Sequence, residues 1–475
     1  MDRVYKETAV ILKKLEGKHG SLQSLVFTSK NACSVKKKLF ALASQTMKYK
    51  SPILEAMKEC SLPGNAPKIG RHLCMILVYD LVFGKGIQCG GPLKRFMMEN
   101  KEKLKSALSN QDRVNSECSR PVVLPKYARV NLLKVSVEKV IDLLKDINYN
   151  IVSREDFLEH FKSCSLPKQL AQTKKLSHAD ECCSHNIFCK DSLLDDVLMF
   201  CPSSSLTSTQ LYATSHLILQ DKASCLPAYL LAPPPGGVVI DACAAPGNKT
   251  THLASLLSNS GTIYSFDKDR RRYSTLVKMV EKSGSTCVKP QCQDFLKVNP
   301  SDYLDVTHIL VDPSCSGSGI FSRIDFDSKK PDMGRLQSLS SFQKRILKHA
   351  LSFPSVKKVV YSTCSVHCEE NEHVIEDALS CFEDDFELID CLQDWDRRGE
   401  TSFAVGSCCI RMCSDDLTNG FFVAVFNRKL NTSVKTKSQT FEQKKQLESP
   451  IPKQICASVR KRKKNKKGKH PVTKK

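Results

Sequence analysis

The chain has 475 residues, of which 41% are hydrophobic, and this length suits about three compact units. The formal net charge of +22 favours an anionic partner such as nucleic acid. No apolar run approaches the ~20 residues of a membrane span, since the longest, LCMILVYDLVF, contains Asp80, and the charged start MDRVYKETAVILKKLEG lacks a cleavage site. We therefore expect an intracellular protein without membrane contact, in which the 23 cysteines are reduced and mostly packing residues.

Residues 1–118 are expected to form a helical domain. Apolar residues recur at helical spacing in VYKETAVILKKL, HLCMILVYDLV and LKRFMMENKEKLKSAL. Glycines at positions 17 and 84 and the pair Gly90 and Gly91 separate these runs.

Residues 119–205 are expected to form a small α/β subdomain. The proline-bearing SRPVVLPKY is a linker, and an amphipathic helix follows from Ser136, a good N-cap, in SVEKVIDLLKDI. Later in this region, CCSHNIFC brings together Cys182, Cys183, His185 and Cys189. A zinc site is one interpretation, but adjacent cysteines without a second CxxC or HxxxH pair are poorly spaced for zinc, and a loop is favoured.

Residues 206–430 alternate short β-rich runs with helical segments, which predicts βαβ units and a parallel sheet. The expected strands lie in GVVIDACAAPGNKTTHLASLL, GTIYSFDKDRRR, CVKPQCQDF, THILVDPSC and KKVVYSTCS. Noteworthy polar residues follow the end of each strand, and ligands bind at that edge of an open parallel α/β sheet.

The first two strands predict a nucleoside-binding site. Asp267 lies 26 residues after Asp241, near the spacing at which a second-strand carboxylate binds a ribose hydroxyl pair. The first loop matches neither GxGxxG nor a Walker A loop, because Asn248 stands where glycine would precede Lys249. A nucleoside-bearing ligand without a pyrophosphate is favoured, and S-adenosylmethionine is the common one on this topology.

The last two strands each end near a thiol. Cys315 and Cys364 follow strands expected to be neighbours, on turns that open helices, although a cysteine is by default a packing residue. A helix N-terminus lowers the pKa of a thiol and so favours the attacking thiolate. Asp312, three residues before Cys315, is either a helix cap or a group placed to contact a substrate ring nitrogen.

Residues 431–475 are expected to be a disordered basic tail. They hold 15 Lys and Arg and 2 Glu, so 13 of the 22 net charges lie there, and VRKRKKNKKGKH lacks apolar periodicity. The tail is a solubilising segment, a set of phosphate contacts to nucleic acid, or a nuclear address, and the two functional interpretations are favoured.

The motifs DACAAPGNKT, DPSCSGSG and YSTCS, in this order, resemble the NOL/NOP/Sun-domain family of RNA (cytosine-5) methyltransferases, which is related to the bacterial Fmu enzyme. RVNLLK near Arg129 and LILQDKASCLPA add to the resemblance, which covers roughly residues 125–430. Asn248, the order Pro313-Ser314-Cys315 and the ending FFVAVF are most similar to the fifth branch, large-subunit ribosomal RNA methylases. The usual wording at the fourth strand is Asp-Ala-Pro-Cys, and this chain departs from it.

The resemblance implies an α/β fold: a Rossmann-like class I S-adenosylmethionine-dependent methyltransferase domain, an N-terminal helical domain and a small α/β RNA-binding subdomain. It implies that Cys364 attacks carbon 6 of cytosine, that Asp312 holds the ring nitrogen, and that Cys315 assists release of the product. It implies a binding site for S-adenosyl-L-methionine made of Cys243, Ala244, Ala245, Pro246, Gly247, Asn248, Lys249, Asp267, Arg272, Asp294 and Asp312.

The expected partner is RNA, foremost ribosomal RNA or pre-ribosomal particles, bound by a monomer in the nucleus and nucleolus, with a role in ribosome biogenesis. A transfer RNA cytosine-5 methyltransferase is an alternative. An amino-group methylase of the same topology is a second, against which Cys315 argues, since those enzymes place Asn/Asp-Pro-Pro-aromatic at the fourth strand. A catalytically silent RNA-binding assembly factor is a third, and the intact Asp312, Cys315 and Cys364 speak against it.

Overall fold

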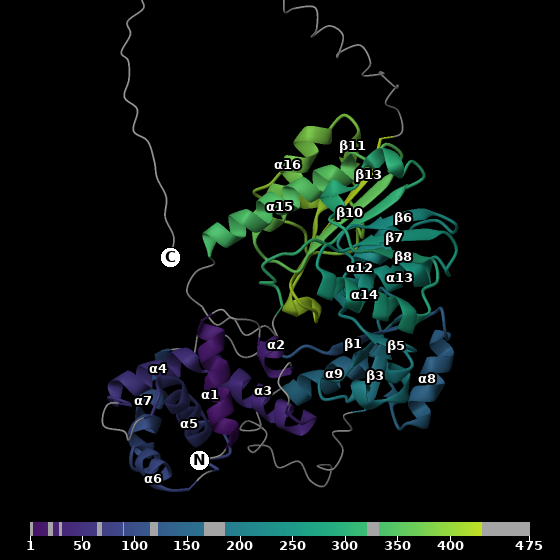
Figure 1. Cartoon of the computed structure of the whole chain (residues 1–475). Coiled ribbons are helices and arrows are strands. Elements are labelled where there is room, and N and C mark those ends of the chain that lie inside the picture. The colour runs from purple at the N-terminus through teal and green to yellow at the C-terminus, as the bar shows by residue number, and fades with distance from the viewer. Residues whose placement is uncertain are drawn as a thin grey trace, which may run out of the picture. The chain divides into compact units, whose positions relative to one another are not determined.

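The computed structural model describes residues 3–17, 22–27, 31–63, 69–88, 90–114, 122–165, 186–320 and 332–429 (Figure 1). The expected tail at residues 431–475 lies outside these ranges, as do Cys182, Cys183 and His185 of the alternative zinc site. In the described part of the chain, no helix is both long and apolar enough to cross a membrane.

The N-terminal region is helical, as the apolar spacing predicts. Its helices are α1 (Arg3–Glu16), α2 (Leu22–Phe27), α3 (Cys33–Lys48), α4 (Lys50–Glu59), α5 (Arg71–Val82), α6 (Pro92–Glu99) and α7 (Lys101–Val114). They enclose their own core, in which α5 is central because its residues from Cys74 to Val78 are all buried. Asp80, which interrupts the apolar run of α5, is also buried, and it accepts a hydrogen bond from the hydroxyl of Tyr5.

A five-stranded sheet in the order β2-β3-β4-β1-β5 follows. Its elements are β1 (Lys126–Val130), α8 (Val137–Asp146), β2 (Asn150–Ile151), α9 (Arg154–Ser165), β3 (Ile187–Lys190), β4 (Val197–Phe200), η1 (Leu206–Ser208), α11 (Gln210–Ala213) and β5 (Leu217–Leu219). The predicted boundary at residue 205 is therefore too early. β5 belongs to this sheet because it pairs with β1 in antiparallel register, a long-range contact that local periodicity cannot reveal.

Helix α8 forms where the sequence predicts it. The hydroxyl of Ser136 accepts a hydrogen bond from the backbone N–H of Lys139 at 3.3 Å, which caps the helix. The buried residues Val137, Val140, Ile141 and Leu144 lie on one face at helical spacing and pack against the small sheet.

The third region holds an eight-stranded sheet in the order β11-β13-β10-β9-β6-β7-β8, with β12 paired to β13. Its strands are β6 (Val238–Asp241), β7 (Thr262–Phe266), β8 (Val288–Gln291), β9 (His308–Val311), β10 (Lys358–Thr363), β11 (Phe386–Leu388), β12 (Ile410–Met412) and β13 (Phe421–Arg428). Its helices are α12 (Lys222–Leu231), α13 (Asn248–Leu256), α14 (Arg270–Ser283), η2 (Phe295–Lys297), η3 (Pro300–Asp302), α15 (Met333–Leu351), η4 (Cys368–Glu370), α16 (Glu372–Phe382), η5 (Gly406–Cys408) and η6 (Ser414–Asp416). The five predicted strands, β6 to β10, are all present and parallel to their neighbours among these five, which confirms the predicted α/β class.

Alternate residues of the central strands face opposite sides of this sheet. Val239, Leu310 and Val360 pack in a core with α12, α13 and α14, whereas their chain neighbours pack with α15 and α16. A sheet covered on both faces exposes its functional groups only at its ends. The carboxyl ends of β6, β7, β9 and β10 therefore define where a site can lie.

The small sheet is joined to the large one through Arg129 in β1. This side chain is fully buried; its Nε donates to Gln220 Oε1 at 3.0 Å and its second terminal nitrogen to Thr251 Oγ1 at 3.1 Å in α13. The predicted motif residue thus contacts the first turns of the helix that follows the cofactor loop.

Candidate active site

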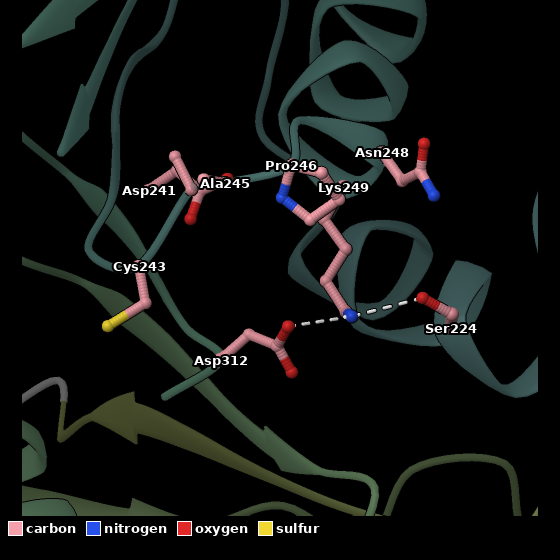
Figure 2. Close-up of a pocket in the computed structure, with 9 residues that line it drawn as sticks. Ser224, Asp241, Cys243, Ala245, Pro246, Asn248, Lys249 and Asp312 are labelled. Atoms are coloured by element: carbon pink, nitrogen blue, oxygen red, sulfur yellow. Dashed lines mark hydrogen bonds and ion pairs between the residues drawn. The ribbon is translucent and has the colours of Figure 1, made fainter. Parts of the chain in front are cut away.

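A cavity of about 70 Å³ lies at the carboxyl ends of β6 and β9 (Figure 2). It is lined by Ser224, Asp241, Cys243, Ala244, Ala245, Pro246, Asn248, Lys249 and Asp312. Most of the predicted cofactor residues therefore come together here. Gly247 lies at the turn between β6 and α13 with φ of +111°, a conformation that only glycine adopts readily, and Met279 would contact a Cβ at 3.1 Å.

Asp241 is the most deeply buried carboxylate of this cavity. Its Oδ2 accepts a hydrogen bond from Thr250 Oγ1 at 2.7 Å, while its Oδ1 is buried without a partner among the described residues. Burial raises the pKa of Asp241 to about 7. An orphaned acceptor in a cavity is ready for a donor such as the ammonium group of an amino-acid ligand.

This pKa predicts a pH-dependent stability. Between the ordinary value of 3.8 and about 7, the folded protein holds a proton on Asp241 that the unfolded chain has released, so the free energy of unfolding must fall as pH rises. Replacing Asp241 by Asn should remove this slope while keeping the acceptor for Thr250. Denaturant unfolding at pH 5 and pH 8 should show a loss larger by about 3 kcal/mol in the wild type; equal losses in both proteins would contradict the raised pKa.

Lys249 and Asp312 form the polar centre of the cavity. Lys249 Nζ lies 2.8 Å from Asp312 Oδ2 and donates to Ser224 Oγ at 3.0 Å, whereas the side chain of Asn248 points away from this pair (Figure 2). Burial lowers the pKa of Lys249, but the adjacent Asp312 more than offsets it, so the net pKa is raised. Asp312 Oδ1 accepts a second hydrogen bond from Ser362 Oγ at 2.9 Å, and its carboxylate is thus held from both sides.

Asp267 and Arg272 lie beside the cavity, not in its lining. The Asp267 side chain is 5% exposed and sits 3.5 Å from Arg272, which donates to the carbonyl oxygen of Ala245 at 2.5 Å. This chain of contacts links the end of β7 to the β6 loop. Asp294 instead caps η2 by accepting from the backbone N–H of Leu296 at 3.2 Å, so its predicted role at the adenine stays a prediction.

Cys315 and Cys364 meet, with their sulfur atoms 3.2 Å apart. They do so because β9 and β10 are adjacent and parallel, as the sequence predicts. The expectation that a helix N-terminus lowers both thiol pKa values is wrong for Cys315. The hydrogen bond with Cys364 and then burial raise its pKa, and η4 and α16 follow Cys364 instead.

Sequence reasoning missed two residues that hold the two cysteine turns. The fully buried Glu370 accepts hydrogen bonds from the N–H and hydroxyl of Ser316, at 2.8 and 2.6 Å, and from Gln343 at 3.1 Å. Its neighbour Asn371 accepts from Thr363 Oγ1 at 2.6 Å and donates to the carbonyl oxygen of Ser365 at 3.0 Å. The run CEENE after Cys364 was the available signal, since consecutive polar residues before a helix suggest capping or loop contacts.

Two glycines hold the loop after Cys315 against the end of the sheet. Gly319 donates its N–H to the carbonyl oxygen of Cys364 at 2.9 Å, and Gly420 donates to that of Gly319 at 2.8 Å. A Cβ on Gly420 would lie 2.8 Å from Gly319 Cα, so the close approach requires glycine. In the described part of the chain, no cluster of His, Cys, Asp and Glu suits a metal ion.

Family descriptions match three successive parts of this chain. The 16S rRNA methyltransferase RsmB/F description matches residues 228–427. The N-terminal and ferredoxin-like domains of NOL1/NOP2/Sun domain family member 5 match residues 37–119 and 124–220. The last match ends beyond β5, in agreement with the corrected boundary of the small sheet.

Known proteins resemble the chain over nearly its whole length. A 28S rRNA (cytosine-C(5))-methyltransferase of Mus musculus is 39% identical, over 90% of this chain and 91% of that protein. The 25S rRNA (cytosine-C(5))-methyltransferase rcm1 of Schizosaccharomyces pombe is 36% identical, over 88% and 90%. The solved structure of PH0851 has the same fold, with a TM-score of 0.60 and 21% identity over 90% of this chain and 99% of that chain.

Proposed function

The chain belongs to the NOL1/NOP2/Sun domain family of S-adenosylmethionine-dependent RNA (cytosine-5) methyltransferases, and we propose that it methylates a cytosine of large-subunit ribosomal RNA. The pair of sulfur atoms 3.2 Å apart beside Asp312 carries this proposal. The ribosomal substrate rests on the relatives, whose names specify 28S and 25S rRNA.

The cavity residues fit S-adenosylmethionine. The orphaned Asp241 Oδ1 suits the ammonium of its amino-acid part, and the buried Asp267 at the end of β7 suits the ribose hydroxyls. The bound cofactor supplies an electrophilic methyl group on a sulfonium. Lys249, fixed by Asp312 and Ser224, closes the cavity on the side of Cys364.

Attack on the base begins with Cys364. Carbon 5 of cytosine is a poor nucleophile, and addition of the Cys364 thiolate to carbon 6 makes it electron-rich enough to accept a methyl group. Asp312, held by Lys249 and Ser362, binds the ring nitrogen so that negative charge does not accumulate on the ring. The target base leaves its stack to reach these groups, which costs least in a loop.

Release of the product falls to Cys315. After loss of the carbon 5 proton, the bond between carbon 6 and Cys364 breaks and Cys364 leaves as a thiolate. The raised pKa of Cys315 keeps it a neutral thiol, so it donates a hydrogen bond to the sulfur of Cys364 as charge develops there.

Replacing Asp267 by Ala should weaken cofactor binding without unfolding the protein. A lost hydrogen bond from a charged group is worth about 1.5–3 kcal/mol, or about 10- to 100-fold in affinity. Isothermal titration calorimetry with S-adenosylmethionine measures the loss, and the melting temperature without cofactor serves as the control. Unchanged affinity would remove Asp267 from the site.

Bisulfite mapping of RNA from cells with and without the protein tests the proposed reaction. One large-subunit rRNA cytosine should lose its methyl group when the protein is removed and regain it with the wild-type chain but not with Cys364→Ala. Loss of methylation only in transfer RNA would redirect the substrate. Intact methylation together with a defect in ribosome assembly would favour the silent assembly factor.

We also propose that the protein acts as a monomer in the nucleolus, with its basic residues 431–475 as part of the address. Light scattering of the purified chain tests the first point. A fluorescent fusion lacking residues 431–475 tests the second: it should lose nucleolar accumulation, and unchanged accumulation would leave the tail as an RNA contact or a solubilising segment.

A further inference from the structure

A second, larger cavity of about 500 Å³ lies in the N-terminal helical domain, between the end of α5 and helices α6 and α7. It is lined by Leu81, Lys85, Gly86, Ile87, Gln88, Gly90, Lys94, Met98 and Lys101. Three of these residues are lysines, and none of the described lining residues is acidic. The cavity is therefore strongly electropositive.

The lysines are available to a ligand. In the described part of the chain, no ion pair holds Lys85, Lys94 or Lys101, whereas Lys50 and Lys105 of the same domain pair with glutamates. Asp80, the nearest carboxylate in sequence, is buried and engaged by the hydroxyl of Tyr5. Helix α6 begins at Pro92, beside Gly90, and adds the positive end of its dipole to the same place.

The floor of the cavity is rigid. Gly86 donates its N–H to the carbonyl oxygen of Asp80 at 2.9 Å, and the N–H of Gln88 donates to Tyr5 Oη at 3.0 Å. The side chain of Gln88 also donates back to the carbonyl oxygen of Gly86 at 3.0 Å. These bonds fix the loop after α5 to α1 and α5, so the cavity does not depend on its occupant for its shape.

Apolar surface lies beside the three cations. Leu81 and Ile87 form a buried part of the wall, while Met98 is 46% exposed. A ligand with a phosphate and an apolar or aromatic portion matches this combination, and a nucleotide unit of RNA has both. A bare inorganic anion would leave the apolar wall unused.

We propose that this cavity binds a phosphodiester of the RNA substrate, with the adjoining ribose or base against Met98. The proposal rests on RNA being the substrate, and it gives the N-terminal domain a direct role in holding that RNA away from the reacting cytosine. The lysines supply charge to the phosphate and the fixed loop supplies the shape.

The test compares two triple variants of the full-length chain. Lys85, Lys94 and Lys101 are changed to Gln in the first. Lys37, Lys38 and Lys58, which are exposed on α3 and α4 of the same domain and do not line the cavity, are changed to Gln in the second. Both variants lose the same charge, so any difference between them reports on the position of the lysines.

RNA binding is measured by fluorescence anisotropy across a series of salt concentrations, with a ribosomal RNA fragment. Each lost contact to single-stranded RNA lowers the slope of log K against log salt by about 0.7, so the cavity variant should lose about 2 and bind up to about 100-fold more weakly at 0.1 M salt. The control variant should change far less. Equal losses in both variants would overturn the proposal, because general electrostatic attraction would then explain them.

Hydrogen exchange of the wild-type chain locates the contact independently. RNA should protect peptides that cover residues 81–101, and exchange of α5 in the RNA-free variants checks that they are folded. Adenosine monophosphate and inorganic phosphate serve as separate probes: protection by either one but not by RNA would make this a site for a free nucleotide or phosphate and overturn its role with RNA. If the chain binds RNA here but methylates none, the proposed function fails while this inference stands.

Discussion

Replacing Cys364 by Ala should abolish methyl transfer, whereas replacing Cys315 by Ala should trap the protein on its RNA. Cys364 supplies the only bond that activates the ring, so its loss should cost on the order of 10⁴-fold or more, the scale found when other enzymes lose a covalent nucleophile. RNA binding should remain. Cys315→Ala leaves attack and transfer possible but removes the thiol donor 3.2 Å from the leaving sulfur, so elimination slows.

The two outcomes are separated on a denaturing gel with labelled RNA. Cys315→Ala should give a slowly migrating protein–RNA band that requires S-adenosylmethionine, and Cys364→Ala and the double variant should give none. A band with Cys364→Ala alone would reverse the two roles. Full methylation by both variants would make the thiols packing residues and would end the enzyme proposal.

The edge of the sheet on which these residues lie could be predicted because it depends on local pattern. Strands β6, β7, β9 and β10 are short apolar runs, and each ends in a polar residue or a thiol. Parallel strands bring their carboxyl ends to one edge, so Asp241, Lys249, Asp312 and Cys364 had to lie near one another once the topology was recognised.

The contacts that hold the site could not be predicted in the same way. Glu370 reaches Ser316, 54 positions earlier, and Gly420 touches Gly319, about 100 positions earlier. No local spacing encodes such a pair. The raised pKa of Cys315 has the same origin, because it depends on the sulfur of Cys364 and on burial, neither of which is visible in the sequence around position 315.

Glu370 offers the sharpest test of whether holding the Cys315 loop matters to the reaction. Glu370→Gln keeps the shape of the side chain but replaces one acceptor by a donor facing Ser316 or Gln343, which are themselves donors. An unmet buried hydrogen bond of this kind should cost about 1–3 kcal/mol of stability. The loop that carries Cys315 would also loosen, and without the Glu370 charge the pKa of Cys315 falls, so its thiol is less secure as a donor.

We therefore expect Glu370→Gln to accumulate the same covalent protein–RNA adduct as Cys315→Ala, although Cys315 itself is intact. The matched control is Glu372→Gln, two positions away: Glu372 is also fully buried, but its carboxylate binds Arg411 at 2.7 and 2.8 Å and not the Cys315 loop. That variant should lose comparable stability and form no adduct. Loss of stability by itself predicts less enzyme in both variants and an adduct in neither. If both behave in that way, Glu370 serves only the fold, and the position of Cys315 relative to Cys364 is maintained by the Gly319 and Gly420 contacts alone.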